Sequence, residues 1–127
     1  MKQPIATNDA PQAIGPYAQA VRAGQWVFLS GQIGLDPASG ELVSGGVVAE
    51  TERVLANVRA VLAAAGLGVE HVVRTTIYLV DLGDFARVNE IYGRVFNAPF
   101  PARATVGVAA LPRGARIEID AIAIQGA

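Results

Sequence analysis

The sequence predicts an α+β fold in which two helices pack on one face of a mainly antiparallel sheet, in the order ββαβαββ. Two segments carry apolar residues at intervals of three and four, which is typical of amphipathic helices. The segments around them are rich in β-branched and aromatic residues, which favour strands. Because the 127 residues contain no linker, repeat or low-complexity tract, we expect one domain, 1–127, with a single hydrophobic core.

The N-terminal part of the chain is predicted to form an arm followed by a β-hairpin. Residues 1–16 contain three prolines and should form a loop or an extended arm. The hairpin runs from Tyr17 to Leu35, with its turn at Ala23 and Gly24. Its segment from Trp26 to Leu29 is too apolar for a half-exposed strand, so the hairpin should lie near the centre of the sheet.

The middle of the chain is predicted to form two helices separated by a strand. The first helix covers about Val48–Ala65, and Gly66 supplies its C-terminal stop. Residues 72–80 are rich in β-branched and aromatic side chains and should form a strand. A second helix follows, capped by Asp81 or Asp84 and ended by the two prolines of the segment NAPFP.

The last two strands, about 103–111 and 116–124, are predicted to pair as a hairpin around the turn PRGA. In that register Glu118 faces Gly107 or Val108, about 17 Å along the strand from Arg103. Arg103 and Glu118 would then not touch within one hairpin. Either the register is looser, or the two residues converge by another route, such as across a subunit boundary.

The polar composition argues against several classes of enzyme. Without cysteine the chain can form no disulfide, thiolate nucleophile or cysteine-ligated metal site. The one histidine, His71, falls between a helix and a strand, where a solvated loop side chain is the simpler interpretation than a Ser/His/Asp triad. Most histidine and carboxylate metal sites use a second histidine, and no glycine-rich phosphate motif occurs. We therefore expect neither a metal nor another cofactor.

The charge balance argues against nucleic acid as a partner. Ten basic and eleven acidic residues give a formal net charge of −1, and the arginines form no basic stripe. No apolar run approaches the roughly 20 residues that span a bilayer, and the first ten residues lack the apolar region of a signal peptide. We expect a cytoplasmic protein without membrane partners.

A few polar residues stand among apolar neighbours and are candidates for a site: Tyr17, Ser30, Asn89, Arg103 and Glu118. We expect them to be buried. The strand face that carries Arg103 continues with Thr105 and Gly107, whose small side chains leave space above the guanidinium.

A buried arginine with an open fork matches a planar carboxylate, which points to a small organic acid as ligand. The alternative is a structural ion pair with Glu118 or Asp120, since an unpaired buried charge is costly. Glu118 has its own alternative as a solvated charge on an edge strand. The residues alone leave these alternatives open.

The chain resembles the RidA/YjgF family over essentially its whole length. The C-terminal signature of that family, P-A-R followed by a short apolar strand and I-E-I, stands here as PARATVGVAALPRGARIEI, from Pro101 to Ile119. The segments IATNDAPQAIGPYAQAV, SGQIGLDPASGEL and AAGLGVEHVVRTTIYLVDLGDFARVNEIY are also similar to the family.

The resemblance implies a chorismate-mutase-like fold, a homotrimer with sites between subunits, and cofactor-independent deamination of 2-iminopropanoate, 2-iminobutanoate and 2-aminoacrylate to 2-keto acids and ammonia. It implies that Arg103 binds the substrate carboxylate and that Glu118 holds or activates water. The remaining residues that it places at the site, where they shape and polarise the pocket, are Tyr17, Ser30, Gly31 and Asn89. Position 105 carries threonine where many members have cysteine. Thr105 can still offer a hydroxyl and a backbone N–H.

Two other functions remain as alternatives. The trimer could be a regulatory module that uses Arg103 to bind keto acids without turnover, in which case Glu118 would be dispensable. RNA cleavage, known for some relatives, fits less well with the net charge and the single histidine. The small residues near Arg103 suggest a short aliphatic substrate tail.

Overall fold

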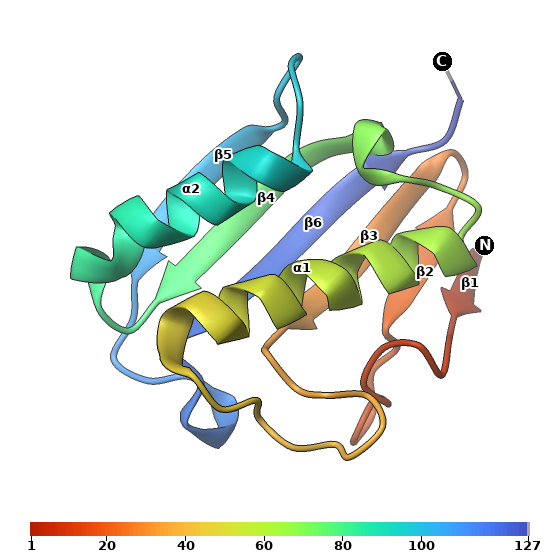
Figure 1. The fold of residues 1–127 in the computed structure, drawn as a ribbon. Helices are drawn as coiled ribbons and strands as arrows, with labels where there is room; N and C mark the ends of the chain where they lie inside the picture. Colours follow the sequence, from red (N-terminus) through yellow and green to blue (C-terminus); the bar gives the residue numbers. More distant parts are fainter. Residues whose placement is uncertain (127) are drawn as a thin grey trace.

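A computed structural model describes residues 1–126 of the chain and confirms the α+β class. Six strands form one sheet in the order β1-β2-β3-β6-β4-β5. The two α-helices lie side by side across one face of this sheet (Figure 1). The strands are β1 (Lys2–Ile5), β2 (Ala20–Ala23), β3 (Trp26–Gln32), β4 (Val72–Leu79), β5 (Ala102–Gly107) and β6 (Ile117–Ile124). The helices are α1 (Gly46–Ala64) and α2 (Phe85–Val95), with 3₁₀ turns η1 (Val69–His71), η2 (Leu82–Asp84) and η3 (Pro112–Gly114).

The N-terminal arm, which the sequence predicts to be a loop or an extended segment, contributes a strand of its own. β1 pairs antiparallel with β2 and places Pro4 opposite Val21. Because β1 is the edge of the sheet, a proline that donates no hydrogen bond is tolerated there. The predicted hairpin of β2 and β3 is confirmed, with Gly24 in the left-handed conformation at φ 61°. The segment from Trp26 to Leu29 is nevertheless half-exposed, contrary to the prediction, because helices cover only one face of the sheet and Trp26 and Phe28 lie on the other.

The boundaries of the helices follow from local chemistry. Gly66, at φ 77°, lies just beyond the end of α1, in the place predicted for a stop. Of the two candidate caps, the Asp81 carboxylate accepts a hydrogen bond from the Gly83 N–H at 2.8 Å and begins η2, which leads into α2. Asp84 precedes α2 without a capping hydrogen bond and instead pairs with Arg87.

The predicted hairpin between the last two strands is wrong. β4 lies between β5 and β6, pairing antiparallel with β6 and parallel with β5. A parallel neighbour is reached here because α2 supplies the long crossover that two parallel strands need. β5 ends at Gly107, four residues short of the predicted end, because the following segment leaves the sheet to form η3.

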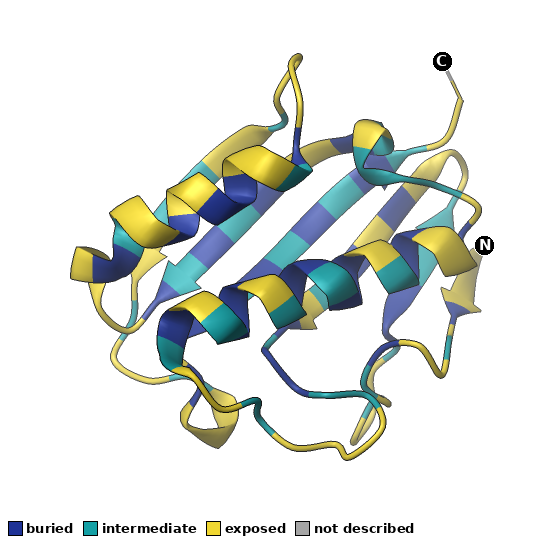
Figure 2. Cartoon of the chain, in the orientation of Figure 1, coloured by how far each residue is buried: buried dark blue, intermediate teal, exposed yellow. Residues whose placement is uncertain are grey.

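The core lies between the helices and one face of the sheet. Side chains along β6 alternate between buried and half-buried positions, and the buried set faces the helices (Figure 2): Ile117, Ile119, Ala121 and Ala123. Their neighbours Glu118 and Asp120 point to the opposite face, which no helix covers. Within residues 1–126, neither helix combines the length and apolar character that a membrane-spanning helix requires.

Candidate functional site

The predicted site residues fall into two groups that line two separate pockets. Tyr17, Ser30, Gly31 and Glu118 line a pocket of about 500 Å³, called the Glu118 pocket below. Asn89 and Arg103 line a second pocket of about 460 Å³, called the Arg103 pocket. Thr105 lines neither.

Glu118 reaches the first pocket because β6 alternates and because β3 is irregular beside it. The pairing of β3 with β6 shifts between Leu29 and Gln32, so that Ser30 and Gly31 together face one residue of β6. Such a bulge re-aims side chains next to functional sites. A Cβ atom on Gly31 would lie 1.9 Å from Oε2 of Glu118, so the carboxylate occupies the space that any other residue at 31 would fill.

The electrostatics of the Glu118 pocket favour a protonatable carboxyl group. Burial, and next the negative charge of Asp120, raise the pKa of Glu118. Within residues 1–126 no group donates a hydrogen bond to its carboxylate, whereas Asp120 accepts one from the Tyr78 hydroxyl at 2.8 Å. The Glu118 carboxylate is therefore available to a water or a ligand.

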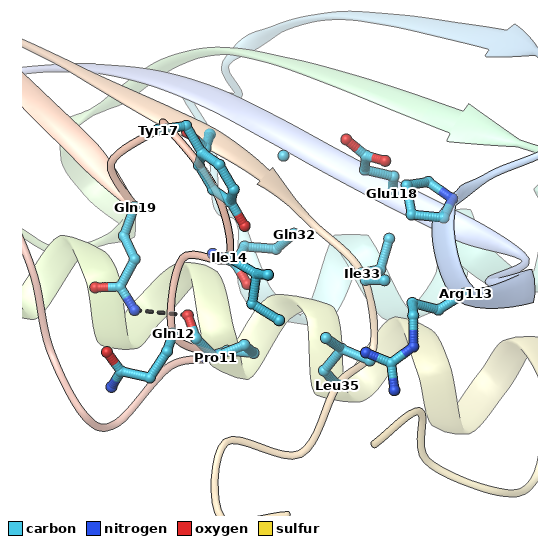
Figure 3. Close-up of a pocket in the computed structure, with 13 residues that line it drawn as sticks. Pro11, Gln12, Ile14, Tyr17, Gln19, Gln32, Ile33, Leu35, Arg113 and Glu118 are labelled. Carbon is cyan, nitrogen blue, oxygen red and sulfur yellow. Dashed lines mark hydrogen bonds between the residues drawn. The ribbon is translucent and has the colours of Figure 1, made fainter. Parts of the chain in front are cut away.

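The loop opposite Glu118 is held by a glutamine that sequence reasoning missed. Figure 3 shows the Tyr17 side chain in the wall of the pocket, across from Glu118. The buried Gln19 amide donates to the carbonyls of Thr7 and Pro11 at 3.0 and 2.7 Å, and so anchors the loop that carries that wall. The one feature of the sequence that could have pointed to Gln19 is that this polar residue directly precedes the apolar start of β2.

Ser30 serves the backbone rather than the open space of the pocket. Its hydroxyl donates to the Ala18 carbonyl at 2.6 Å, and its N–H donates to the Gln19 carbonyl at 3.0 Å. These bonds fix the N-terminal end of β2 against β3. The hydroxyl proton is thereby engaged, and only its lone pairs face a ligand.

The guanidinium of Arg103 is held between α2 and the sheet edge. Its Nη1 donates to Oδ1 of Asn89 at 2.8 Å, and its Cζ lies 4.8 Å from the ring centroid of Tyr92 and 5.4 Å from that of Phe85. The Tyr92 hydroxyl is in turn hydrogen-bonded to Thr75 at 2.7 Å in the core. Stacking and one hydrogen bond to an amide thus orient a cation whose remaining donors have no partner among residues 1–126.

Two expectations for Arg103 need correction. The side chain is exposed rather than buried, because β5 is the edge of the sheet and α2 covers only part of it. Asn89 and Tyr17, which the sequence predicts to be buried, are exposed as well, and Ser30 and Glu118 are half-buried. The structural ion pair with Glu118 or Asp120 is absent, and Arg103 forms no salt bridge with any carboxylate among residues 1–126.

Thr105 presents its backbone rather than its side chain. It is half-buried and pairs with Ile77 on the face of β5 that also carries Arg103. The Val108 N–H donates to the Leu79 carbonyl and so points toward β4. Successive residues of a strand point their N–H groups to opposite sides, so the N–H of every second residue before Val108 also points toward β4 and the N–H groups between them point away. The Thr105 N–H therefore points to the free edge of the sheet.

The two pockets lie on opposite faces of the sheet. Arg103 pairs with Thr75, whose side chain contacts α2, whereas Glu118 pairs with Tyr78 on the uncovered face. Their partners on β4, Thr75 and Tyr78, are three residues apart, and β5 and β6 are two strand spacings apart. The Cα atoms of Arg103 and Glu118 therefore lie about 14 Å from each other. One chain does not bring Arg103 and Glu118 together, as expected from the sequence, although the cause is the intervening β4 and not a long hairpin.

Within residues 1–126, the side chains that commonly bind metals do not gather in groups of three or more. The two pockets offer arginine guanidinium groups, one carboxyl group with a raised pKa, hydroxyl groups and backbone N–H groups. These groups can bind a carboxylate and position a water.

Comparison with known proteins shows the family. Residues 7–125 match the family model described as "Endoribonuclease L-PSP". Protein DfrA of Myxococcus xanthus is 63% identical over 98% of this chain and 96% of its own length. The human 2-iminobutanoate/2-iminopropanoate deaminase is 54% identical over 99% of this chain and 92% of its own. The crystal structure of Escherichia coli TdcF with bound serine matches with a TM-score of 0.93 and 42% sequence identity. The match covers 98% of this chain and 99% of the TdcF chain. The chain therefore belongs to the RidA/YjgF family.

Proposed function

We propose that this protein hydrolyses reactive enamines and imines of short 2-keto acids, 2-aminoacrylate, 2-iminopropanoate and 2-iminobutanoate among them, to 2-keto acids and ammonia. The observation that carries this proposal is the Arg103 guanidinium, which is oriented by Asn89 and Tyr92 and has no carboxylate partner among residues 1–126. Relatives named 2-iminobutanoate/2-iminopropanoate deaminase support the reaction, and the serine bound in a related structure supports a small ligand that carries a carboxylate.

We propose further that the protein is a homotrimer and that each site joins the Arg103 pocket of one subunit to the Glu118 pocket of the next. The two pockets hold complementary halves of the required chemistry on opposite faces of one chain. A closed ring of identical subunits brings such opposite surfaces together at every boundary. The uncovered sheet face also carries partly exposed Trp26 and Phe28, which a neighbouring subunit would bury.

Arg103 acts by fixing the substrate. Its free donors form a charge-assisted pair with the substrate carboxylate, and the Thr105 N–H at the open edge of β5 can donate a further hydrogen bond to the same carboxylate. Holding the carboxylate fixes C2 of the imine relative to Glu118, which removes much of the orientational entropy of the attack.

Glu118 then carries the protons of the reaction. As base it accepts a proton from water while the water oxygen bonds to C2 of the protonated imine and the π electrons of the C=N bond pass to nitrogen. As acid it returns that proton to the amine of the carbinolamine. The C–N bond then breaks as the hydroxyl group gives up its proton to the Glu118 carboxylate and its oxygen forms the C=O bond, so that ammonia and the keto acid leave. General catalysis of this kind contributes about 10²- to 10⁴-fold, and a raised pKa suits a group that must both take and give a proton.

A coupled assay tests the proposal. A pyridoxal-phosphate dehydratase generates the imine from serine or threonine, and release of the keto acid is followed with and without this protein. Acceleration that is lost in Arg103→Ala and in Glu118→Gln supports the proposed reaction, and absence of acceleration for every short-chain imine contradicts it. Retained keto-acid binding in an inactive Glu118→Gln separates catalysis from ligand binding. A wild type that binds keto acids without turnover would favour the regulatory alternative.

A further inference from the structure

The Glu118 pocket is also lined by an arginine that has no role in the proposed reaction. Arg113 lies in η3 and borders the pocket together with Pro112. Figure 3 shows its guanidinium and the Glu118 carboxylate at two ends of the same wall, with Ile33 between them. The pocket therefore carries two charges of opposite sign at separate places.

The charge of Arg113 is not neutralised within the described chain. It forms no salt bridge with a carboxylate of residues 1–126, and its Nη2 donates one long hydrogen bond, 3.3 Å, to the Gly40 carbonyl. The remaining guanidinium donors are free for a ligand. The Arg113 backbone adopts φ 61° and ψ 19°, a left-handed conformation that is uncommon for a residue with a side chain and is concentrated at functional sites.

The wall between the two charges carries apolar side chains, and the pocket is larger than a four-carbon imine needs. Ile33 and Leu35 line it on the side of Arg113, and Ile14 lines it on the loop opposite. About 500 Å³ lies within the range of roughly 300–1,000 Å³ that is typical of pockets for drug-sized ligands. An apolar wall that ends at a cation suits a substrate tail of several methylene groups that ends in an anion.

We propose that Arg113 forms a subsite for a second, distal carboxylate, so that the enzyme also accepts 2-imino dicarboxylates of five or six carbons. This inference rests on the proposed function, because it places the reacting carbon beside Glu118 and the first carboxylate on Arg103 of a neighbouring subunit. Each anionic group of the substrate then has its own cation, which offsets the repulsion by Glu118. The inference extends the short aliphatic tail expected from the sequence to longer, charged tails.

Binding of two matched keto acids tests the subsite without relying on turnover. 2-Oxoglutarate and 2-oxopentanoate have the same chain length and differ in the distal carboxylate. Calorimetry should show that the wild type binds 2-oxoglutarate about five- to tenfold more tightly, the range of a charge-assisted pair in a partly open pocket. Arg113→Gln should abolish this preference, as should Arg113→Gly, which removes the charge while relaxing the left-handed backbone.

Arg59→Gln is the matched control, because it removes an exposed arginine of α1 that lines neither the Glu118 nor the Arg103 pocket. The preference for 2-oxoglutarate over 2-oxopentanoate should survive in this variant. In the wild type and in the control it should shrink as the salt concentration is raised.

Equal affinity for the two acids, no measurable binding of 2-oxoglutarate, or a preference that survives both Arg113 variants would overturn the subsite. Hydrolysis of short-chain imines without a dicarboxylate preference refutes the subsite alone. A preference without any hydrolysis refutes the proposed reaction alone.

Discussion

Gly31 of β3 and Glu118 of β6 approach each other so closely that a Cβ atom at position 31 would lie 1.9 Å from the carboxylate oxygen Oε2 and 2.8 Å from Cδ. The backbone of β3 thus forms the floor against which the Glu118 carboxyl group rests. Because a glutamate side chain is flexible, a larger residue at 31 would move the carboxylate rather than unfold the sheet.

Gly31→Ala is therefore expected to reduce imine hydrolysis by about 10²-fold or more while leaving the fold intact, since a displacement of about 1 Å at a reacting group has that effect. Circular dichroism and the coupled assay together measure both outcomes. In Glu118→Asp the carboxylate is drawn back from position 31, so adding Gly31→Ala to that variant should cost much less activity. Equal losses in the two backgrounds would show that the contact with Glu118 is not the cause.

The acid limb of the pH–rate profile should follow Glu118. Burial and the charge of Asp120 raise the pKa of this carboxyl group, so activity should fall below an inflection above the ordinary glutamate pKa. Asp120→Asn removes the second cause and should move that inflection to lower pH. An inflection that stays in place in Asp120→Asn, or that persists in Glu118→Gln, would contradict this assignment.

The same shift makes Glu118 costly for folding at neutral pH. A folded-state pKa raised above the unfolded value means that the folded protein holds the proton more tightly, so the contribution to stability is full below the unfolded pKa and is lost as pH rises through the folded pKa. Glu118→Gln should therefore raise the free energy of unfolding at pH 7 and have a smaller effect near pH 4. Denaturant titrations at one protein concentration measure both values. A variant that is destabilised at pH 7 would contradict the prediction.

Tyr92 is a positioning residue for Arg103. The guanidinium lies 4.8 Å from its ring centroid, and the Thr75 hydroxyl fixes the ring from the core. Tyr92→Leu should raise KM about two- to fivefold with little change in kcat, because stacking orients the cation that binds the carboxylate. Tyr92→Phe keeps the ring and should keep KM near the wild-type value, at a cost of about 1–3 kcal/mol in stability for the Thr75 hydroxyl left unpaired. Equal KM values in the two variants would remove the stacking role.

Local patterns predicted most elements but could not predict the partners of β5. The helical spacing depends on neighbouring residues, and both predicted helices are confirmed. Which strand pairs with β5 depends on the crossover through α2, a long-range relation that no local pattern contains. The exposure of Arg103 could not be foreseen for the same reason, since it follows from the place of β5 at the edge.

Some site residues could be predicted from the chemical character of their neighbours or from the family resemblance, whereas for others no feature of the sequence indicated a role in the site. Arg103 and Glu118 stood out as charges among apolar neighbours, whereas Gly31 came from the family resemblance and only the structure shows its contact with Glu118. Tyr92 reads in the sequence as one more apolar position of a helix. Arg113 reads as part of a turn, and its place in the Glu118 pocket depends on the conformation of η3, the turn that leads into β6.

The central claim, that each active site joins two chains, is tested most directly by mixing inactive variants. Arg103→Ala and Glu118→Ala subunits, coexpressed in equal amounts, should regain about a quarter of the wild-type activity, because half of the Arg103 pockets and half of the Glu118 pockets are intact and combine at random in a symmetric ring. Asn89→Ala mixed with Arg103→Ala is the control that should recover nothing through this route, since Asn89 and Arg103 line the same pocket. Mixed oligomers of the first pair that remain inactive would contradict the shared site.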